Sequence, residues 1–103
     1  MTPREAADAL AAGALALDVR EDDEWDAAHI AGALHLRLSE LGVRYEELAR
    51  EVPIVCVCRS GGRSAAAATA LAGAGYTTYN LEGGMKAWLA DGLPIEPADG
   101  HVA

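Results

Sequence analysis

The chain has 103 residues, of which 51% are hydrophobic, and it carries a formal net charge of −8. This length gives one domain that can bury about two thirds of its unfolded surface. The negative charge makes nucleic acid and membrane surfaces poor candidate partners, because it repels their phosphates. The first residues lack the basic and apolar regions of a signal peptide, and no apolar run approaches the length of a membrane span. We therefore expect a cytoplasmic protein.

The chain opens with a helix signal. Thr2-Pro3-Arg4-Glu5 has the form of a capping box with proline at the first helical position, and it predicts a helix that ends at Gly13. Residues 14–19 then form a short buried strand. Asp18 and Arg20 lie at its carboxyl end, where open α/β sheets place functional groups. We expect these two residues to brace a neighbouring active-site loop through hydrogen bonds and an ion pair.

The next segment predicts a second helix, a strand and a third helix. Asp22 or Asp23 is expected to cap the short second helix, within an acidic cluster at 21–24 that we interpret as a solvated helix start. Residues 30–36 suggest a strand, and the leucine spacing of 40–50 favours a helix.

The second half continues the alternation of strands and helices. Residues 54–57 form a continuous apolar run, typical of a strand covered on both faces. A helix then runs to about Ala74 with Gly75 as its left-handed cap, and a strand is expected over 77–81. A last helix opens at residues 83–84, whose two glycines let it approach the cysteine loop closely. This pattern predicts a three-layer α/β/α domain with a mainly parallel sheet.

Between the 54–57 strand and the following helix lies Cys58-Arg59-Ser60-Gly61-Gly62-Arg63. A glycine loop at a helix N-terminus turns backbone N–H groups toward a bound anion. Because arginines and a helix N-terminus lower a cysteine pKa, Cys58 is expected to be a reactive thiolate. The candidate site comprises catalytic Cys58 with the loop residues Arg59, Ser60, Gly61, Gly62, Arg63 and Ser64, supported by Asp18 and Arg20. Of the two arginines, we expect Arg59 to contact substrate and Arg63 to hold the loop.

Three separated motifs make the chain resemble the rhodanese-like family of sulfurtransferases, over about residues 2–96. The motifs are Asp18-Val19-Arg20 with Glu24-Trp25, His29-Ile30 and Gly32-Ala33; the 58–63 loop; and Leu81-Glu82-Gly83-Gly84 with Ala87-Trp88. One departure is Ala28, where the family pattern has glycine before the histidine. The resemblance implies a rhodanese-like domain at 1–96 with a sheet of about five strands, followed by a flexible tail at 97–103.

The resemblance also implies an activity. Cys58 would take sulfane sulfur from a donor such as thiosulfate or a persulfide, carry it as a persulfide, and pass it to cyanide, a thiol or a protein acceptor. The alternative within the family is a sulfur-carrier or protein-docking module without turnover. A phosphatase or arsenate reductase fits less well, because those enzymes use Cys-x5-Arg and this chain has Cys-x4-Arg.

The remaining candidate groups have structural interpretations. Cys56 is interpreted as a small core side chain, with a resolving role left open. His29 is interpreted as a hydrogen-bonded structural group, because sulfur transfer through a preformed thiolate needs no base. His35 and His101 form no ligand set with the cysteines, so neither a metal nor another cofactor is implied.

Overall fold

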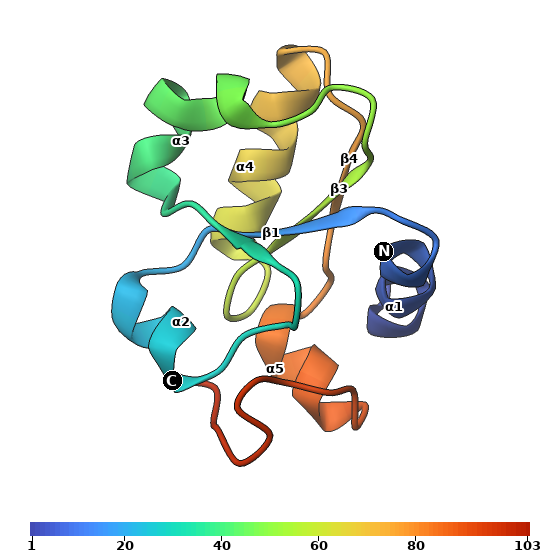
Figure 1. Ribbon diagram of the computed structural model, residues 1–103, viewed down its shortest axis with the longest axis vertical. Helices are drawn as coiled ribbons and strands as arrows, with labels where there is room; N and C mark the ends of the chain where they lie inside the picture. Colours follow the sequence, from blue (N-terminus) through green and yellow to red (C-terminus); the bar gives the residue numbers. More distant parts are fainter.

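The computed structural model describes all residues from 1 to 103 and shows a parallel sheet between two layers of helices (Figure 1). The strands are β1 (Leu15–Asp18), β2 (Leu34–His35), β3 (Ile54–Val57) and β4 (Thr78–Asn80), in the order β2-β1-β3-β4. The helices are α1 (Pro3–Ala11), α2 (Asp22–Ala27), α3 (Leu38–Arg44), the 3₁₀ turn η1 (Tyr45–Glu47), α4 (Gly62–Gly73) and α5 (Gly84–Ala90). The predicted α/β/α class is confirmed.

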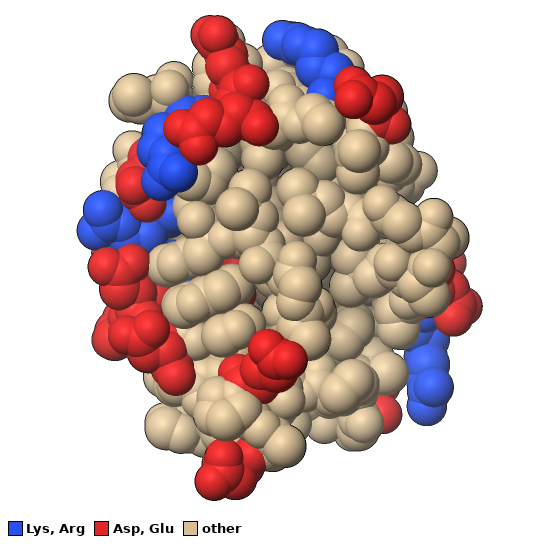
Figure 2. Space-filling view, viewed as in Figure 1, with Lys and Arg blue, Asp and Glu red and all other residues tan.

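Alternating side chains of the strands build a core on each face of the sheet. Leu17, Ile54 and Cys56 pack toward α3 and α4, whereas Ala16 and Val55 pack toward α1 and α5. Because both faces are covered, all four residues of β3 are buried, as its continuous apolar run predicts. The charged side chains gather around the rim of the face seen in Figure 2, and the centre of that face carries almost none.

The sheet has four strands, so the expectation of about five was wrong. The 30–36 segment contributes only the two residues of β2, because Gly32 turns the chain with a φ of 78°. A further pairing is limited to one antiparallel bridge between His29 and Glu96. Pro97 follows directly and has no N–H to extend that bridge.

Two helix boundaries also differ from the prediction. The N-cap of α2 is Glu21, not Asp22 or Asp23, and Glu24 accepts the Glu21 N–H at 3.0 Å. The predicted 40–50 helix ends at Arg44 and continues as η1, where the Tyr76 hydroxyl lies 2.9 and 3.0 Å from the carbonyl oxygens of Tyr45 and Leu48. The capping box at Thr2 and the left-handed Gly75 after α4 are confirmed.

The carboxyl ends of the parallel strands all meet at one edge of the sheet. Asp18, Cys58 and Asn80 lie at or just beyond the ends of three neighbouring strands, β1, β3 and β4. The fold therefore gathers these polar groups at the amino terminus of α4. No helix combines the length and apolar character needed to cross a membrane.

Candidate active site

Cys58 is the first residue after β3 and opens the loop that leads into α4. Its Sγ accepts the Gly61 N–H at 3.0 Å and the Ser64 hydroxyl at 3.1 Å. The residue exposes only 1% of its surface and packs at the edge of the core under α3 and α4. Gly61 can present its N–H in this way because it adopts a φ of 109°, which favours glycine.

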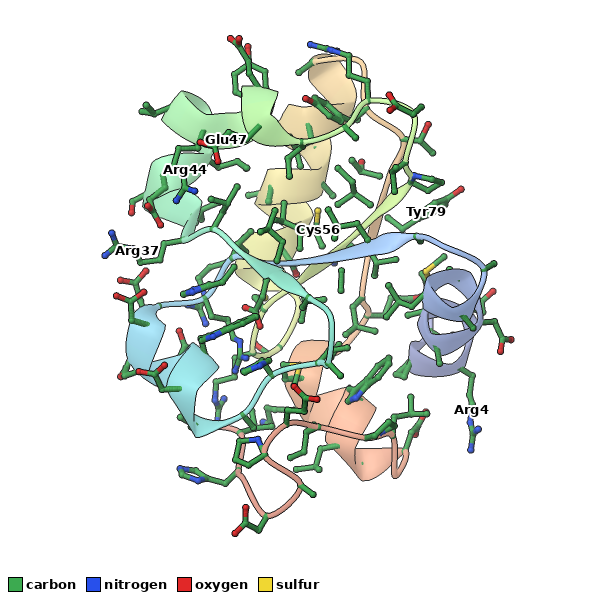
Figure 3. All side chains as sticks on the ribbon, in the orientation of Figure 1. Arg4, Arg37, Arg44, Glu47, Cys56 and Tyr79 are labelled. Atoms are coloured by element: carbon green, nitrogen blue, oxygen red, sulfur yellow. The ribbon has the colours of Figure 1, made fainter.

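Hydrogen bonds lower the pKa of the Cys58 thiol. Burial raises the pKa of the Cys58 thiol, but hydrogen bonds from the Ser64 side chain and from the backbone of Ser64, Gly61 and Ser60 outweigh burial and leave the pKa below its ordinary value. Cys56 is a residue of β3 (Figure 3), and its side chain lies in the core on the α3 and α4 side of the sheet, where burial raises its pKa to about 12. The two cysteines therefore differ in character although they are two residues apart.

The sequence analysis missed Asn80, which connects Gly61 of the loop to Ser64 in the first turn of α4. Its Nδ2 donates to the Gly61 carbonyl at 3.1 Å, and its Oδ1 lies 2.5 Å from the Ser64 hydroxyl. Asn80 is the last residue of β4, which pairs with β3. Its position at the carboxyl end of the strand beside the cysteine was the signal that could have found it.

The two loop arginines point to different places. Arg59 and Ser60 are exposed, and the Arg59 Nε donates to the Ala103 carbonyl at 2.9 Å. Arg63 forms a bidentate ion pair with Glu24, with both N–O distances at 2.7 Å. This pair raises the pKa of Arg63 and lowers that of Glu24 to about 2. Neither arginine therefore donates to the sulfur.

The ion pair corrects our interpretation of the acidic cluster as a solvated helix start. The Glu24 side chain exposes only 13% of its surface, whereas its three neighbours 21–23 are exposed. Its charge neutralises a guanidinium that lies in the first turn of α4, where the helix dipole disfavours a cation. Sequence patterns gave no signal for this contact, because 39 residues separate the partners.

An aromatic stack holds α2 in position for that contact. The Trp25 ring stacks on His29 at 3.7 Å and on His35 at 4.7 Å between ring centroids. One ring nitrogen of each histidine also lies at hydrogen-bond distance from a backbone oxygen. His29 Nδ1 lies 3.0 Å from the Trp25 carbonyl oxygen, and His35 Nε2 lies 2.7 Å from the Arg20 carbonyl oxygen. Both histidines are thus held by stacking and hydrogen bonds.

Asp18 and Arg20 form a buried pair at the same edge of the sheet, and their side chains make no hydrogen bond to the 58–63 loop. The Arg20 Nε and Nη2 donate to the two Asp18 carboxylate oxygens at 2.9 and 2.8 Å, and the residues expose 0% and 1% of their surfaces. Nη2 also donates to the Ala28 carbonyl at 2.7 Å, while Nη1 has no partner. The pair fixes the end of α2, and α2 in turn carries Glu24.

The start of α5 packs on the backbone of the cysteine loop. The Met85 and Lys86 N–H groups donate to the carbonyls of Cys58 and Arg59 at 2.8 and 3.1 Å. Gly84 has a φ of 59°, and a Cβ there would overlap the Cys58 carbonyl oxygen. The predicted close approach of this helix to the loop is confirmed.

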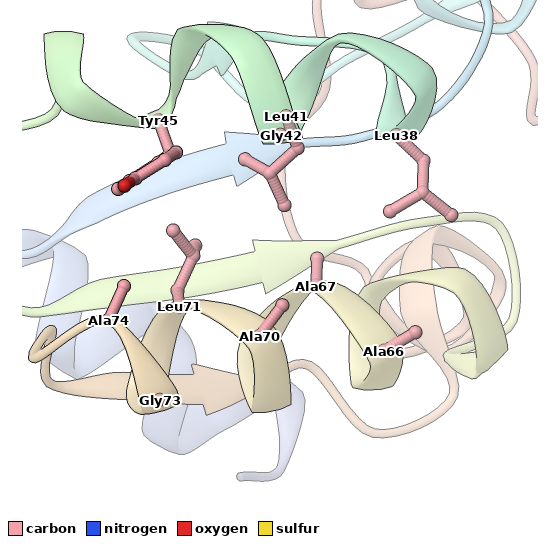
Figure 4. A pocket seen from close by; sticks show the side chains of 10 residues that line it. All are labelled: Leu38, Leu41, Gly42, Tyr45, Ala66, Ala67, Ala70, Leu71, Gly73 and Ala74. Atoms are coloured by element: carbon pink, nitrogen blue, oxygen red, sulfur yellow. The ribbon is translucent and has the colours of Figure 1, made fainter.

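The largest pocket lies apart from this chemistry, between α3 and α4 (Figure 4). It has a volume of about 590 Å³ and is lined mainly by alanine and leucine side chains, and it includes none of the loop residues 58–63. No group of three or more potential metal ligands occurs anywhere in the structure. The tail at 97–103 returns to α2, where the His101 N–H reaches the Ala27 carbonyl at 3.4 Å.

The fold and the site together define a class of small α/β domains that hold a cysteine of lowered pKa in a loop at a helix N-terminus. The family model described as "Rhodanese-like domain" matches residues 2–91, and the chain belongs to this family. Thiosulfate sulfurtransferase GlpE of Ectopseudomonas mendocina is 32% identical over 101 residues, which cover 97% of this chain and 92% of that protein. YtwF of Bacillus subtilis is 38% identical over 78 residues, 76% of each chain.

Solved structures agree with this assignment. A rhodanese-related protein from Thermoplasma volcanium superposes with a TM-score of 0.88 at 30% identity, over 92% of this chain and 94% of that one. A thiosulfate sulfurtransferase from Pseudomonas aeruginosa gives a TM-score of 0.83 at 30% identity, over 93% of this chain and 19% of that one.

Proposed function

We propose that this protein is a sulfurtransferase that carries sulfane sulfur as a persulfide on Cys58. The observation that carries the proposal is the Cys58 Sγ, held by the Gly61 N–H and the Ser64 hydroxyl at the start of α4. Membership of the rhodanese-like family and the thiosulfate sulfurtransferases among its relatives support the same activity.

In the proposed first step, the Cys58 thiolate attacks the outer sulfur of thiosulfate. A bond forms between the two sulfurs, the bond from the outer sulfur to the sulfonate breaks, and sulfite leaves with its electron pair. The negative charge moves from Sγ to the new terminal sulfur, so the step requires no proton and no added oxidant. Backbone N–H groups of residues 59–63 are suited to hold this terminal anion.

In the second step, cyanide or a thiolate attacks the terminal sulfur and releases the Cys58 thiolate. Arg59 is the loop cation that we assign to the anionic donor, because its guanidinium is exposed beside the cysteine. Arg63 is assigned to loop support, since Glu24 already neutralises it. The Cys-x4-Arg spacing disfavours phosphate chemistry, because cysteine-dependent phosphatases use Cys-x5-Arg.

Mass spectrometry tests the proposal directly. The purified protein incubated with thiosulfate is expected to gain the mass of one sulfur atom, and Cys58→Ser should abolish the gain. Cys56→Ser is the matched control and should load normally, because the raised pKa of Cys56 keeps that thiol protonated. An unchanged mass in the wild type, or a gain in Cys58→Ser, would reject the proposed role of Cys58.

Acceptor assays then separate an enzyme from a carrier. We expect the loaded protein to form thiocyanate with cyanide, or to transfer its sulfur to a small thiol, over many cycles. Normal loading with negligible turnover for every free acceptor would instead identify a sulfur carrier that needs a protein partner.

A further inference from the structure

The Ser64 hydroxyl faces two acceptors and has one proton. Its oxygen lies 3.1 Å from the Cys58 Sγ and 2.5 Å from the Asn80 Oδ1. A hydroxyl donates only one hydrogen bond, so it cannot serve both groups at once. Ser64 is fully buried, which leaves the competition to these two acceptors.

The orientation of the Asn80 amide is fixed by the loop. Its Nδ2 donates to the Gly61 carbonyl at 3.1 Å, so its Oδ1 must face Ser64. The opposite orientation would set the amide oxygen against the carbonyl oxygen of Gly61. The backbone of Asn80 is in turn held in the sheet by β3, where it pairs with Cys56.

The charge on the sulfur decides which acceptor receives the proton. A thiolate at Cys58 is a charged acceptor, so the Ser64 O–H points toward it and donates a hydrogen bond to Sγ. The Asn80 Oδ1 then faces the Ser64 oxygen without receiving a hydrogen bond. A neutral Sγ, as in a thiol or in the S–S bond of a persulfide, is a weak acceptor. The Ser64 O–H then rotates and donates its hydrogen bond to the Asn80 Oδ1.

We propose that Asn80 is a positioning residue that accepts the Ser64 hydrogen bond whenever the Cys58 sulfur is uncharged. Asn80 thereby stabilises the uncharged state and limits how strongly the loop favours the thiolate. The persulfide part of this statement rests on the proposed function, but the thiol part does not. Such a limit favours the loading step, because an over-stabilised thiolate is a weaker nucleophile.

The test is the titration of Cys58 in the unloaded protein, followed by the ultraviolet absorbance of its thiolate with Cys58→Ser as the blank. Asn80→Leu leaves the sulfur as the sole acceptor of the Ser64 proton. We expect the Cys58 pKa to fall, with about a threefold higher ratio of thiolate to thiol. Asn80→Asp should shift the pKa upward, because a carboxylate holds the Ser64 proton and repels the thiolate.

Two controls separate this role from simple support of the loop. Thr78→Val removes another hydrogen bond from β4 to α4, the one to the Ala68 carbonyl, and should leave the titration unchanged. In a Ser64→Ala background, Asn80→Leu should no longer lower the Cys58 pKa. If Asn80 only holds Gly61, Asn80→Leu will raise the pKa with or without Ser64, and that result overturns the proposal. The titration requires no sulfur donor, so it stands even if thiosulfate fails to load the protein.

Discussion

At the scale of single residues, the site favours a thiolate mainly through hydrogen bonds. The sulfur of Cys58 receives the Gly61 N–H and the Ser64 hydroxyl, whereas Arg63 pairs with Glu24 and Arg59 extends outward. The predicted lowering of the Cys58 pKa is confirmed. Of the two causes invoked from the sequence, backbone N–H groups at the start of α4 contribute, whereas the arginines are not among the main causes. Arg59, which is exposed and donates from its Nε to the Ala103 carbonyl, is the arginine that we propose for contact with the anionic donor.

Glu24 provides a prediction at this scale, because its pKa is about 2 in the folded protein against 4.5 ordinarily. The folded state therefore binds fewer protons than the unfolded state between these two values. The ion pair with Arg63 stabilises the protein fully above about pH 4.5, and this contribution is lost as the pH falls toward 2. Glu24→Gln is expected to lower the free energy of unfolding by about 1–2 kcal/mol at neutral pH, allowing for screening at the partly exposed Arg63.

Urea unfolding of both proteins at a series of pH values measures this effect. The difference between wild type and Glu24→Gln should shrink as the solution becomes more acidic and should vanish near the folded pKa. Glu51→Gln is the matched control, since the exposed Glu51 makes no ion pair. A difference that persists unchanged at low pH would mean that Glu24 acts through packing and not through its charge.

At the scale of elements, sequence patterns located what local chemistry determines. The apolar run 54–57, the glycine loop and the alanine-rich helix were all recognisable, so the place of Cys58 could be predicted. Contacts between distant segments could not. Asn80 reaches Ser64 across 16 residues, and the Tyr76 hydroxyl reaches the carbonyls of Tyr45 and Leu48 across 31 and 28 residues. Neither contact leaves a periodic pattern in the sequence.

The start of α5 gives the prediction at this scale. Any other residue at position 84 would have to adopt the left-handed φ of Gly84, which costs about 1–2 kcal/mol. Its Cβ would also overlap the Cys58 carbonyl oxygen. Gly84→Ala should therefore destabilise the protein and displace the loop that holds the sulfur. The second effect is measured as a Cys58 pKa closer to that of an ordinary thiol.

Gly42→Ala is the control for this substitution. Gly42 lies inside α3 with no positive φ and no atom near its missing Cβ, so alanine there should be neutral or stabilising by up to about 1 kcal/mol. Equal effects of the two substitutions on stability and on the Cys58 titration would show that α5 does not need its close approach to the loop.

At the scale of the whole molecule, the sheet separates two cores and collects the polar groups at one edge. One core lies under α3 and α4 and includes Cys58, and the other lies under α1 and α5. The only buried ion pair, Asp18–Arg20, sits at the same edge of the sheet and fixes the end of α2. We propose that the pair supports the site through α2, which carries Glu24, the partner of Arg63.

We expect the domain to lose more stability when one partner of the Asp18–Arg20 pair is removed than when both are removed together. Asp18→Leu leaves a buried guanidinium without its partner and Arg20→Met leaves a buried carboxylate, so each is expected to lower the free energy of unfolding by about 3–5 kcal/mol. The double variant buries no charge and should lose less than either single variant, although the Ala28 carbonyl still lacks its donor. Urea unfolding gives the three values, and near-additive losses would contradict a coupled buried pair. If both single variants fail to fold and the double variant keeps native circular dichroism, the conclusion is the same as from the expected values. In that case removal of both charges, but not of one, leaves a core without an unpaired buried charge.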